Sequence, residues 1–486
     1  MHKQLSDYDT LGARAHYTTG HDSTKCHAHI SGATPANHPI DPVAALGVLM
    51  KNYTLSTRTL VQGVERTPWM ARPDGAGGWQ QADLPRHGSV QMASGEIAAE
   101  MKQRLQAEAL RFLAGKKKIG ILLSGGMDSR IVAAIVRQLQ EDGSYAGDVV
   151  ALTWGLDDSR DVIYAQRIAD RFGWEFRHFP LNAEVLRQNI IIAADRGAEY
   201  SPVHLHAMDA VSQTQGLDGV LAGSYGDSIG RGEYSGRRVN ELPHILDKHL
   251  NHFAFMLRSV EQGALAAIRT DLATDRARFP GRSEMAYREI EMQMHYMRRQ
   301  LNACMEVIDD RIPLYQMFGA PEMFGFMWSL DPACRSDANY EHLLKLLPGN
   351  LLDIPWARTG APYGQPEAAP EDNRSKLNNR YGEWLRNELR QFVLDEIGSG
   401  ALQSLGIFNE RSLAMWSRHW PKSKKSKADR LDEKMAWLAS LSLFVKKYNI
   451  KGIEPPARYS MADRLGQTKA FLHTKLYHAA LGILKR

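Results

Sequence analysis

The sequence predicts an α/β fold with a doubly wound parallel sheet, followed by a mostly helical C-terminal part. Between residues 117 and 223, short apolar runs alternate with amphipathic helical segments, which is the pattern of parallel strands joined by crossover helices. The first of these runs ends in a turn rich in Gly and Ser. After residue 240 the periodicity is helical, broken by Pro-rich connections such as residues 354–364.

Composition and charge bound the class of protein. The chain has 486 residues, 43% hydrophobic and 24% charged, which is an ordinary balance for a soluble globular protein. A net charge of +5 over this length does not mark a nucleic-acid binder. The polar N-terminus lacks the apolar run of a signal peptide, and no stretch of about 18 apolar residues predicts a transmembrane segment. We therefore expect a cytoplasmic protein.

The N-terminal quarter carries the weakest patterns. Residues 1–42 lack periodicity and predict a poorly ordered leader. Residues 43–93 predict a small β part, with a strand at 58–62 and a turn at 72–78, where Asp-Gly and Gly-Gly occur. Ser94 is expected to cap a helix over residues 95–114, which carries one apolar face.

Four strands and three helices are predicted in the next segment. The strands are apolar runs at 119–123, 149–154, 174–179 and 219–223, and the helices lie at 129–140, 161–172 and 203–214. Gly173 ends the second helix. Because ligands of doubly wound sheets bind at the carboxyl ends of the strands, the chemistry is expected in the loop after Leu123.

The C-terminal part has two basic segments. Residues 421–430 predict a solvated, basic loop before a helix at 431–447. Residues 468–486 form a basic amphipathic helix that either docks on the body of the protein or lies on a membrane surface.

Ser124-Gly125-Gly126-Met127-Asp128-Ser129 is the most informative segment. Its glycines let the backbone approach an anion closely, and the helix that follows presents free N–H groups and its dipole. Ser124 and Ser129 add hydroxyl donors, and Asp128 is suited to hold Mg²⁺. The lysine and spacing of a Walker loop are absent. A plain Gly-Ser turn is the structural alternative.

This loop resembles that of the N-type ATP pyrophosphatases, which release pyrophosphate from ATP. Within that group, the chain resembles the asparagine synthetase family in four segments. They are residues 158–173, residues 221–228 (LeuAlaGlySerTyrGlyAspSer), residues 309–315 with 328–332, and residues 58–69. The resemblance implies an adenine nucleotide alpha hydrolase-like fold. It divides the chain into a leader (1–42), a remnant of a glutaminase-like domain (43–93) and a synthetase-like domain (94–486).

The resemblance also implies the ligands and their residues. The cofactors are ATP and Mg²⁺. ATP is expected to bind Ser124, Gly125, Gly126, Asp128 and Ser129 through its phosphates, and to bind Leu122, Leu123, Thr153, Trp154 and Gly223 through its adenosine. Asp128 and Asp227 are expected to share the magnesium ion, since two carboxylates at adjacent strand ends can hold one ion on the polyphosphate.

The chain departs from the family pattern at three places. No cysteine stands at the N-terminus, and the glutaminase part is too short, so nitrogen is expected from ammonia, an amine substrate or a separate protein. Ser224 stands where the family has its catalytic Glu, and Tyr225 follows it. Glu341 stands where the family has a late lysine, and Arg358 or Lys345 could supply the cation instead, although Lys345 is expected to be a solvated helix residue.

These features predict an AMP-forming carbon–nitrogen ligase that adenylates a carboxylate, for example a sugar uronic acid or a natural-product acid. Catalytic roles fall to Ser224, Tyr225 and Arg358. Two alternatives stay open: a tRNA-modifying ATP pyrophosphatase, and a non-catalytic nucleotide-binding relative. His204 and His206 form a His-X-His pair, for which a surface position is expected rather than metal ligation.

Overall fold

The protein is built around a five-stranded parallel sheet, seen in a computed structural model that describes residues 16–20, 22–231, 244–246, 251–367, 376–422, 429–454 and 460–483. The strands are β6 (Lys118–Leu122), β7 (Asp148–Gly155), β8 (Glu175–Pro180), β9 (Gly219–Ala222) and β10 (Leu314–Gln316). Their order is β10-β9-β6-β7-β8. The order reverses between β6 and β9, which places the topological switch point between those two strands.

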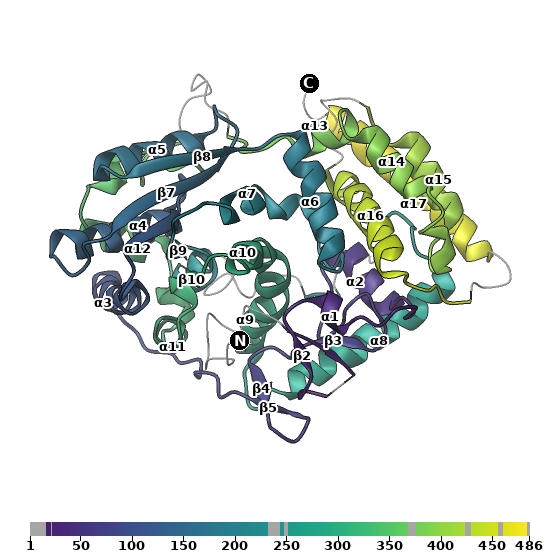
Figure 1. Cartoon of the computed structure of the whole chain (residues 1–486), viewed down its shortest axis with the longest axis horizontal. Coiled ribbons are helices and arrows are strands. Elements are labelled where there is room, and N and C mark those ends of the chain that lie inside the picture. Colours follow the sequence, from purple (N-terminus) through teal and green to yellow (C-terminus); the bar gives the residue numbers. More distant parts are fainter. Residues whose placement is uncertain are drawn as a thin grey trace.

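Helices cover both faces of this sheet. Successive side chains of a strand point to opposite faces, and those on each face pack into a separate core. Leu122 lies in one core, and Ile121 and Leu123 lie in the other. One face is covered by α3 (Ser94–Leu113), α4 (Met127–Glu141), α5 (Arg160–Phe172) and α12 (Asp337–Lys345), and the other by α6 (Ala183–Asp195), α7 (Met208–Ser212) and α10 (Asn302–Asp309) (Figure 1). The predicted doubly wound α/β class is confirmed.

Several predicted elements differ in the structure. The sheet has a fifth strand, β10, which is too short and too close to Pro313 to show an alternating pattern. The predicted helix at 203–214 is a 3₁₀ turn (Pro202–Leu205) followed by the short α7, and the sequence analysis missed α6. Ser94 does not cap α3, because the helix begins there and Ala93 is the cap residue.

The N-terminal part forms a small antiparallel sheet of β1 (Tyr17–Thr19), β2 (Cys26–His27) and β3 (Val64–Arg66), with α1 (Ile30–Ala33) and α2 (Pro42–Lys51) beside it. The predicted strand at 58–62 is wrong, since the Thr59 hydroxyl donates within a turn to the Val61 and Val64 carbonyls. The predicted turn at 72–78 is confirmed between β4 (Ala71–Pro73) and β5 (Trp79–Gln81).

The leader is more ordered than the sequence predicts, over the residues that the structure describes. Tyr17 pairs with Arg66 across β1 and β3, so residues 17–19 and 64–66 belong to one sheet. Arg66 is buried and reaches Glu199 (3.1 Å) and Glu306 (3.2 Å), which anchors this sheet to the main body. Residues 1–15 lie outside the described residues, and the proposed domain boundaries stay a prediction.

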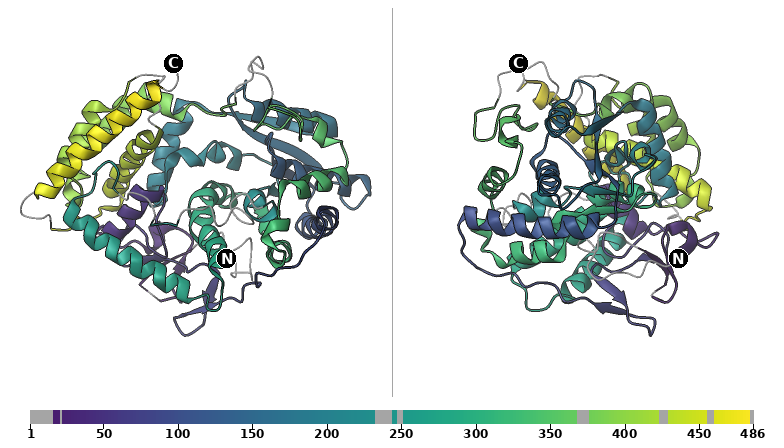
Figure 2. Two further views of the ribbon diagram at one scale, coloured as in Figure 1. Left: turned by 180° about the vertical axis from the view of Figure 1, so that it is seen from behind. Right: turned by 60° about the vertical axis from the view of Figure 1, so that its left-hand side comes forward.

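Beyond β9 the structure is mainly helical, as predicted. The further helices are α8 (Arg258–Ala277), α9 (Glu284–Glu291), the π-helical η5 (Met292–Leu301), α11 (Pro321–Ser329), α13 (Tyr381–Arg386), α14 (Arg390–Gly398), α15 (Glu410–His419), α16 (Asp429–Tyr448) and α17 (Met461–Ile483). Helices α14 to α17 gather at the end of the molecule away from β7 and β8 (Figures 1 and 2). Most of the basic run at 421–430 lies outside the described residues. Among the helices that the structure describes, none has the length and apolar character to cross a membrane.

Candidate functional site

The Gly-rich loop joins β6 to α4 at the switch point, and its own hydroxyl groups hold its shape. The Ser124 N–H donates to Ser129 Oγ (3.1 Å), and the Gly126 N–H donates to Ser124 Oγ (3.1 Å). Gly126 is the residue before α4, so the loop leads directly into the N-terminus of that helix. The sequence therefore places a compact turn and a helix N-terminus at the carboxyl end of the central strand, where an anion is favoured.

Glycine is needed at position 125 because the loop of residues 354–361 packs closely against it. A Cβ on Gly125 would lie 2.8 Å from Ala357 Cβ, and the Ala357 N–H donates to the Gly125 carbonyl (3.1 Å). The buried Arg130 fastens the same contact. Its guanidinium donates to the carbonyls of Leu351, Ile354, Pro355 and Gly125 at 2.7 to 3.2 Å.

The loop after β9 packs directly against Asp128. A Cβ on Gly223 would lie 2.6 Å from the Ser129 nitrogen, and a Cβ on Gly226 would lie 2.5 Å from Asp128 Oδ1. Two glycines are thus needed for the two loops to meet. This contact brings the loop that carries Asp227 next to Asp128, as the sequence analysis expected from adjacent strand ends.

The close contact between Gly223 and the start of α4 leads us to expect that Gly223→Ala destabilises the protein. The new methyl group collides with backbone of α4, which cannot turn aside, so we expect a loss of about 1–3 kcal/mol of unfolding free energy. Urea denaturation followed by circular dichroism measures it. Gly263→Ala in α8 is the matched control, because nothing lies within 4 Å of its added methyl group. That variant is expected to gain up to about 1 kcal/mol, since alanine favours a helix. Equal stability of the two variants would contradict the close contact.

Asp128 and Asp227 have two neighbours in common, Arg231 and Tyr340. Burial opposes the charge on Arg231, yet its pKa lies above the ordinary value because Asp128 and, more weakly, Asp227 stabilise the cation. Burial, Asp128 and Asp227 all raise the pKa of Tyr340. The Tyr340 hydroxyl donates to the Gly226 carbonyl (2.8 Å), which fixes the second loop to α12.

Arg231 is a site residue that the sequence analysis missed. Its Nε lies 3.5 Å from Asp128 Oδ1, and its Nη1 lies 3.3 Å from Asp337 Oδ1. Its guanidinium lies 5.8 Å from the centre of the Tyr340 ring and 5.5 Å from that of Trp356. The available signal was a single arginine four residues after Asp227, which no pattern distinguishes from a surface arginine.

Arg358 reaches the same region from the opposite loop. Its guanidinium lies 4.7 Å from the centre of the Trp356 ring. Trp356 thus has the Arg231 and Arg358 cations near its ring. Burial raises the pKa of Asp128, and Arg231 and, less strongly, Arg358 act in the opposite direction. Two cations therefore converge on the carboxylate of the Gly-rich loop.

Asp128 has the character of a metal ligand. Its Oδ1 is buried and accepts no hydrogen bond from the residues that the structure describes. Carboxylate oxygens are the ligands that Mg²⁺ prefers, and Asp227 stands on the adjoining loop. The residues present therefore fit a magnesium ion between the two loops, while the metal role of Asp128 and Asp227 stays a prediction.

The side chains of the other predicted ATP ligands mostly pack in the cores or join strands. Leu122 and Leu123 belong to the two cores, so any contact with a nucleotide uses their backbone. The buried Thr153 hydroxyl donates to the Leu123 carbonyl (2.8 Å) and joins β7 to β6. Trp154 is half-buried at the end of β7, where its ring centre lies 6.1 Å from that of His206.

Tyr225 is poorly placed for the predicted catalytic role. Its side chain is 2% exposed and lies in the core, and burial raises its pKa well above the ordinary value. Tyr225 has a left-handed backbone (φ 69°), which turns the chain toward Gly226. The catalytic role of Tyr225 stays a prediction, for a side chain that packs in the core. Ser224 is half-buried at the start of this loop, and its role stays a prediction.

His204 and His206 are half-buried rather than at the surface. His206 Nδ1 bonds the Tyr381 hydroxyl (2.9 Å), and His204 Nε2 bonds the Gln300 amide (2.6 Å). Burial lowers the pKa of His206 to about 3 and that of His204 to about 4, so both rings are neutral at pH 7. Within the described part of the chain, no three His, Cys, Asp or Glu side chains are grouped for metal binding.

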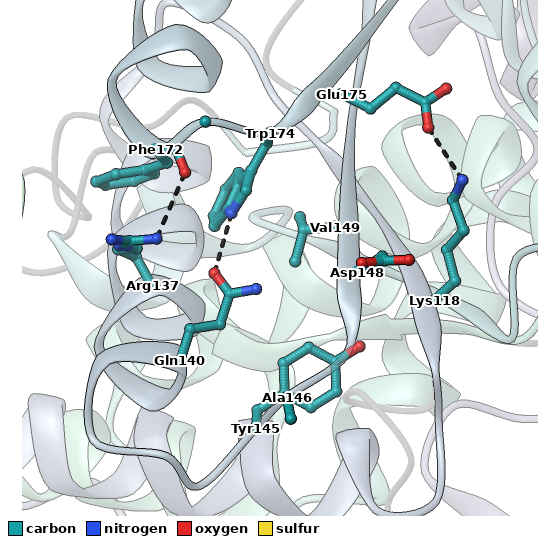
Figure 3. Close-up of a pocket in the computed structure, with 11 residues that line it drawn as sticks. Lys118, Arg137, Gln140, Tyr145, Ala146, Asp148, Val149, Phe172, Trp174 and Glu175 are labelled. Carbon is teal, nitrogen blue, oxygen red and sulfur yellow. Dashed lines mark hydrogen bonds and ion pairs between the residues drawn. The ribbon is translucent and has the colours of Figure 1, made fainter.

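A separate hollow of about 540 Å³ lies at the amino ends of β6, β7 and β8, away from these loops. Two pairs of its polar side chains bond each other: the Trp174 indole donates to Gln140 (3.0 Å), and Lys118 pairs with Glu175 (3.0 Å) (Figure 3). Because ligands of doubly wound sheets bind at the opposite edge, we give this hollow no part in the reaction.

The doubly wound sheet and the two loops that meet at its switch point define a nucleotide-binding α/β domain. Residues 100–311 match the family model for asparagine synthase. The chain is 34% identical over 68 residues to human asparagine synthetase [glutamine-hydrolyzing], a match covering 14% of this chain and 12% of that protein. It is 26% identical over 140 residues to a putative asparagine synthetase of Methanocaldococcus jannaschii, covering 28% and 25%. The matched segments thus span a quarter or less of these relatives.

Two solved structures show only a distant likeness. One is the U34-tRNA thiolase NcsA from Methanococcus maripaludis, at 12% identity and a TM-score of 0.23, covering 56% of this chain and 87% of that one. The other is a predicted subunit of tRNA methyltransferase from Methanocaldococcus jannaschii, at 13% identity and a TM-score of 0.16, covering 32% and 64%. At these scores the likeness supports no substrate.

Proposed function

We propose that this protein is an ATP-dependent amide-forming ligase, which adenylates a carboxylate with release of pyrophosphate and then transfers nitrogen from ammonia or an amine. The observation that carries the proposal is the contact between the two loops at the switch point, in a region that matches the family model for asparagine synthase. That contact brings Asp128 beside the loop that carries Asp227, and Arg231 lies next to Asp128. Arg358 comes from the separate loop at 354–361.

Each group has a chemical task in this proposal. The backbone of the Gly-rich loop and the N-terminus of α4 bind the departing pyrophosphate. Asp128 and Asp227 would hold a magnesium ion, which supplies charge neutralisation on the polyphosphate. Arg231 and Arg358 stabilise the negative charge that develops as the α–β phosphate bond breaks, which is the task of the missing family lysine.

The nucleophile needs no strong base if it arrives as a neutral amine. Ser224 is the polar side chain of the second loop where the family has its glutamate, and a serine hydroxyl at neutral pH serves as a hydrogen-bond partner rather than as a base. A substrate amine with a lowered pKa, or ammonia delivered by a separate protein, fits this arrangement.

The positions of Cys304 and Cys334 argue against the alternative of tRNA thiolation. Cys304 is buried, and burial raises its pKa to about 12, which suppresses the reactive thiolate. The Cys334 thiol is half-buried and donates to the Gln91 side chain (3.3 Å). Neither thiol stands in the two loops of the site.

The proposal is tested by incubating the protein with Mg²⁺, ATP and a panel of carboxylic acids, including uronic acids and amino acids. We expect pyrophosphate and AMP to appear only with the correct acid, and hydroxylamine to trap that acid as its hydroxamate. Formation of ADP and phosphate instead would contradict cleavage between the α- and β-phosphates. Nucleotide binding without turnover for every acid and amine tested would favour a non-catalytic relative.

A further inference from the structure

The C-terminal helix α17 packs on the body through its less apolar side and turns its most apolar side outward. Its buried residues are Asp463, Ala470 and Thr474. Asp463 accepts hydrogen bonds from the Arg258 N–H (2.7 Å) and the Ser460 hydroxyl (2.6 Å). Phe471 lies beside α15, where its ring centre is 6.1 Å from that of Trp416. The helix is therefore docked, but not by its leucines.

Four large apolar side chains form one exposed stripe along α17. Met461, Leu465, Leu472 and Leu476 are 54 to 71% exposed. Their spacings of four, seven and four residues place them on a single side of the helix. At about 1.5 Å per residue, the stripe is about 22 Å long. Isolated exposed leucines are ordinary on a protein surface, but four large apolar side chains on one side of a helix, with only Thr468 between Leu465 and Leu472, mark an interaction surface.

Cations border this stripe on both sides. At 100° per residue, Arg464 and Lys475 fall along one border and Lys469 falls along the other, and all three are exposed. The acidic residue of the described turns, Asp463, is buried against the body. The exposed side of α17 therefore combines an apolar centre with positive margins.

The geometry points to an anionic lipid surface as the occupant: we propose that α17 lies in the membrane interface with its stripe in the acyl region and its cations among anionic head groups. Long Lys and Arg stems suit that position, because they extend from an apolar face to charged groups. A second copy of this chain is a worse partner, since it would bring the cations of two stripes together. In Figure 2 (left view), α17 (yellow) lies at the outer edge of the helical part. This inference is independent of the proposed reaction.

Cosedimentation of the full chain with lipid vesicles tests the proposal. We expect binding to phosphatidylcholine vesicles that contain about a third phosphatidylserine, weakening as salt is added. The double variant Leu472→Gln/Leu476→Gln is expected to lower the partition coefficient at least about 10-fold. Lys469→Glu/Lys475→Glu is expected to abolish the preference for phosphatidylserine.

The matched control is Leu110→Gln/Leu346→Gln, which changes two exposed leucines (39% and 44%) outside α17 and should bind as the wild type does. Circular dichroism confirms folding of each variant. The proposal is overturned if the wild-type protein binds neither phosphatidylcholine vesicles nor those that contain phosphatidylserine. It is also overturned if the α17 leucine variant binds vesicles as well as the control variant does. A dimer in solution that only the α17 leucine changes dissociate would assign the stripe to a second copy and likewise overturn it.

Discussion

Replacing Asp128 with asparagine is expected to lower Mg²⁺-dependent pyrophosphate release at least about 100-fold while the protein stays folded. The loss follows because asparagine removes the negative ligand that would hold the ion on the polyphosphate. Folding survives because burial already disfavours the charged form of Asp128, so a neutral side chain of the same shape is tolerated. Pyrophosphate release at saturating ATP, with thermal unfolding alongside, measures both effects.

Asp142→Asn is the matched control, because Asp142 stands at the opposite end of the same helix and is exposed. An asparagine there can still accept the Ser144 N–H bond that Asp142 makes (3.0 Å). Wild-type release from the Asp128 variant would remove the proposed metal role. Equal losses in the two variants would show that the assay responds to α4 and not to the ion.

Arg231→Ala is expected to lower pyrophosphate release about 100-fold, the usual cost of removing a group that stabilises charge in the transition state. It should also reduce stability by about 1–3 kcal/mol, because it leaves the partly buried Asp128 without its nearest cation. Arg231→Lys keeps the charge but not the planar contact with Tyr340 and Trp356, so an intermediate rate is expected. Steady-state kinetics and urea denaturation provide the two measurements.

A double-mutant cycle separates the two effects of Arg231. In the Asp128→Asn background, Arg231→Ala should cost less stability than it does in the wild type, since the charge that it partners is gone. Arg187→Ala, an arginine that is 45% exposed on α6, should change neither rate nor stability. A full-rate Arg231→Ala variant would leave Arg358 as the cation of the site.

The sheet and the Gly-rich loop were predictable because their signals are local. An apolar run, two glycines and an amphipathic helix lie next to one another in the chain, so β6, the turn and α4 follow from short-range chemistry. Asp227 was reachable for the same reason, since it follows the strand next to β6. These positions depend on sequence neighbours and on the rule for carboxyl strand ends.

Arg231, Tyr340 and Trp356 were not predictable, since their meeting depends on long-range packing. Tyr340 comes from α12 and Trp356 from a loop, and each looks like a core or surface residue in its own segment. Tyr225 shows the converse, a residue whose neighbours in the chain differ from its neighbours in the fold. Its position next to Ser224 suggested chemistry, but a left-handed backbone turns its ring into the core. β10 was missed because three residues show no period.

The hydrogen bonds of Arg130 limit how the proposed site can open. One guanidinium binds carbonyls of two segments more than two hundred residues apart in the chain, Gly125 on one side and residues 351–355 on the other. A hinge movement between these two segments would break the hydrogen bonds of the buried Arg130 guanidinium. We therefore expect the Gly-rich loop and residues 351–355 to move together. Under the proposed reaction, we therefore expect pyrophosphate to leave on the opposite side of the site, where Arg231 lies beside Asp128.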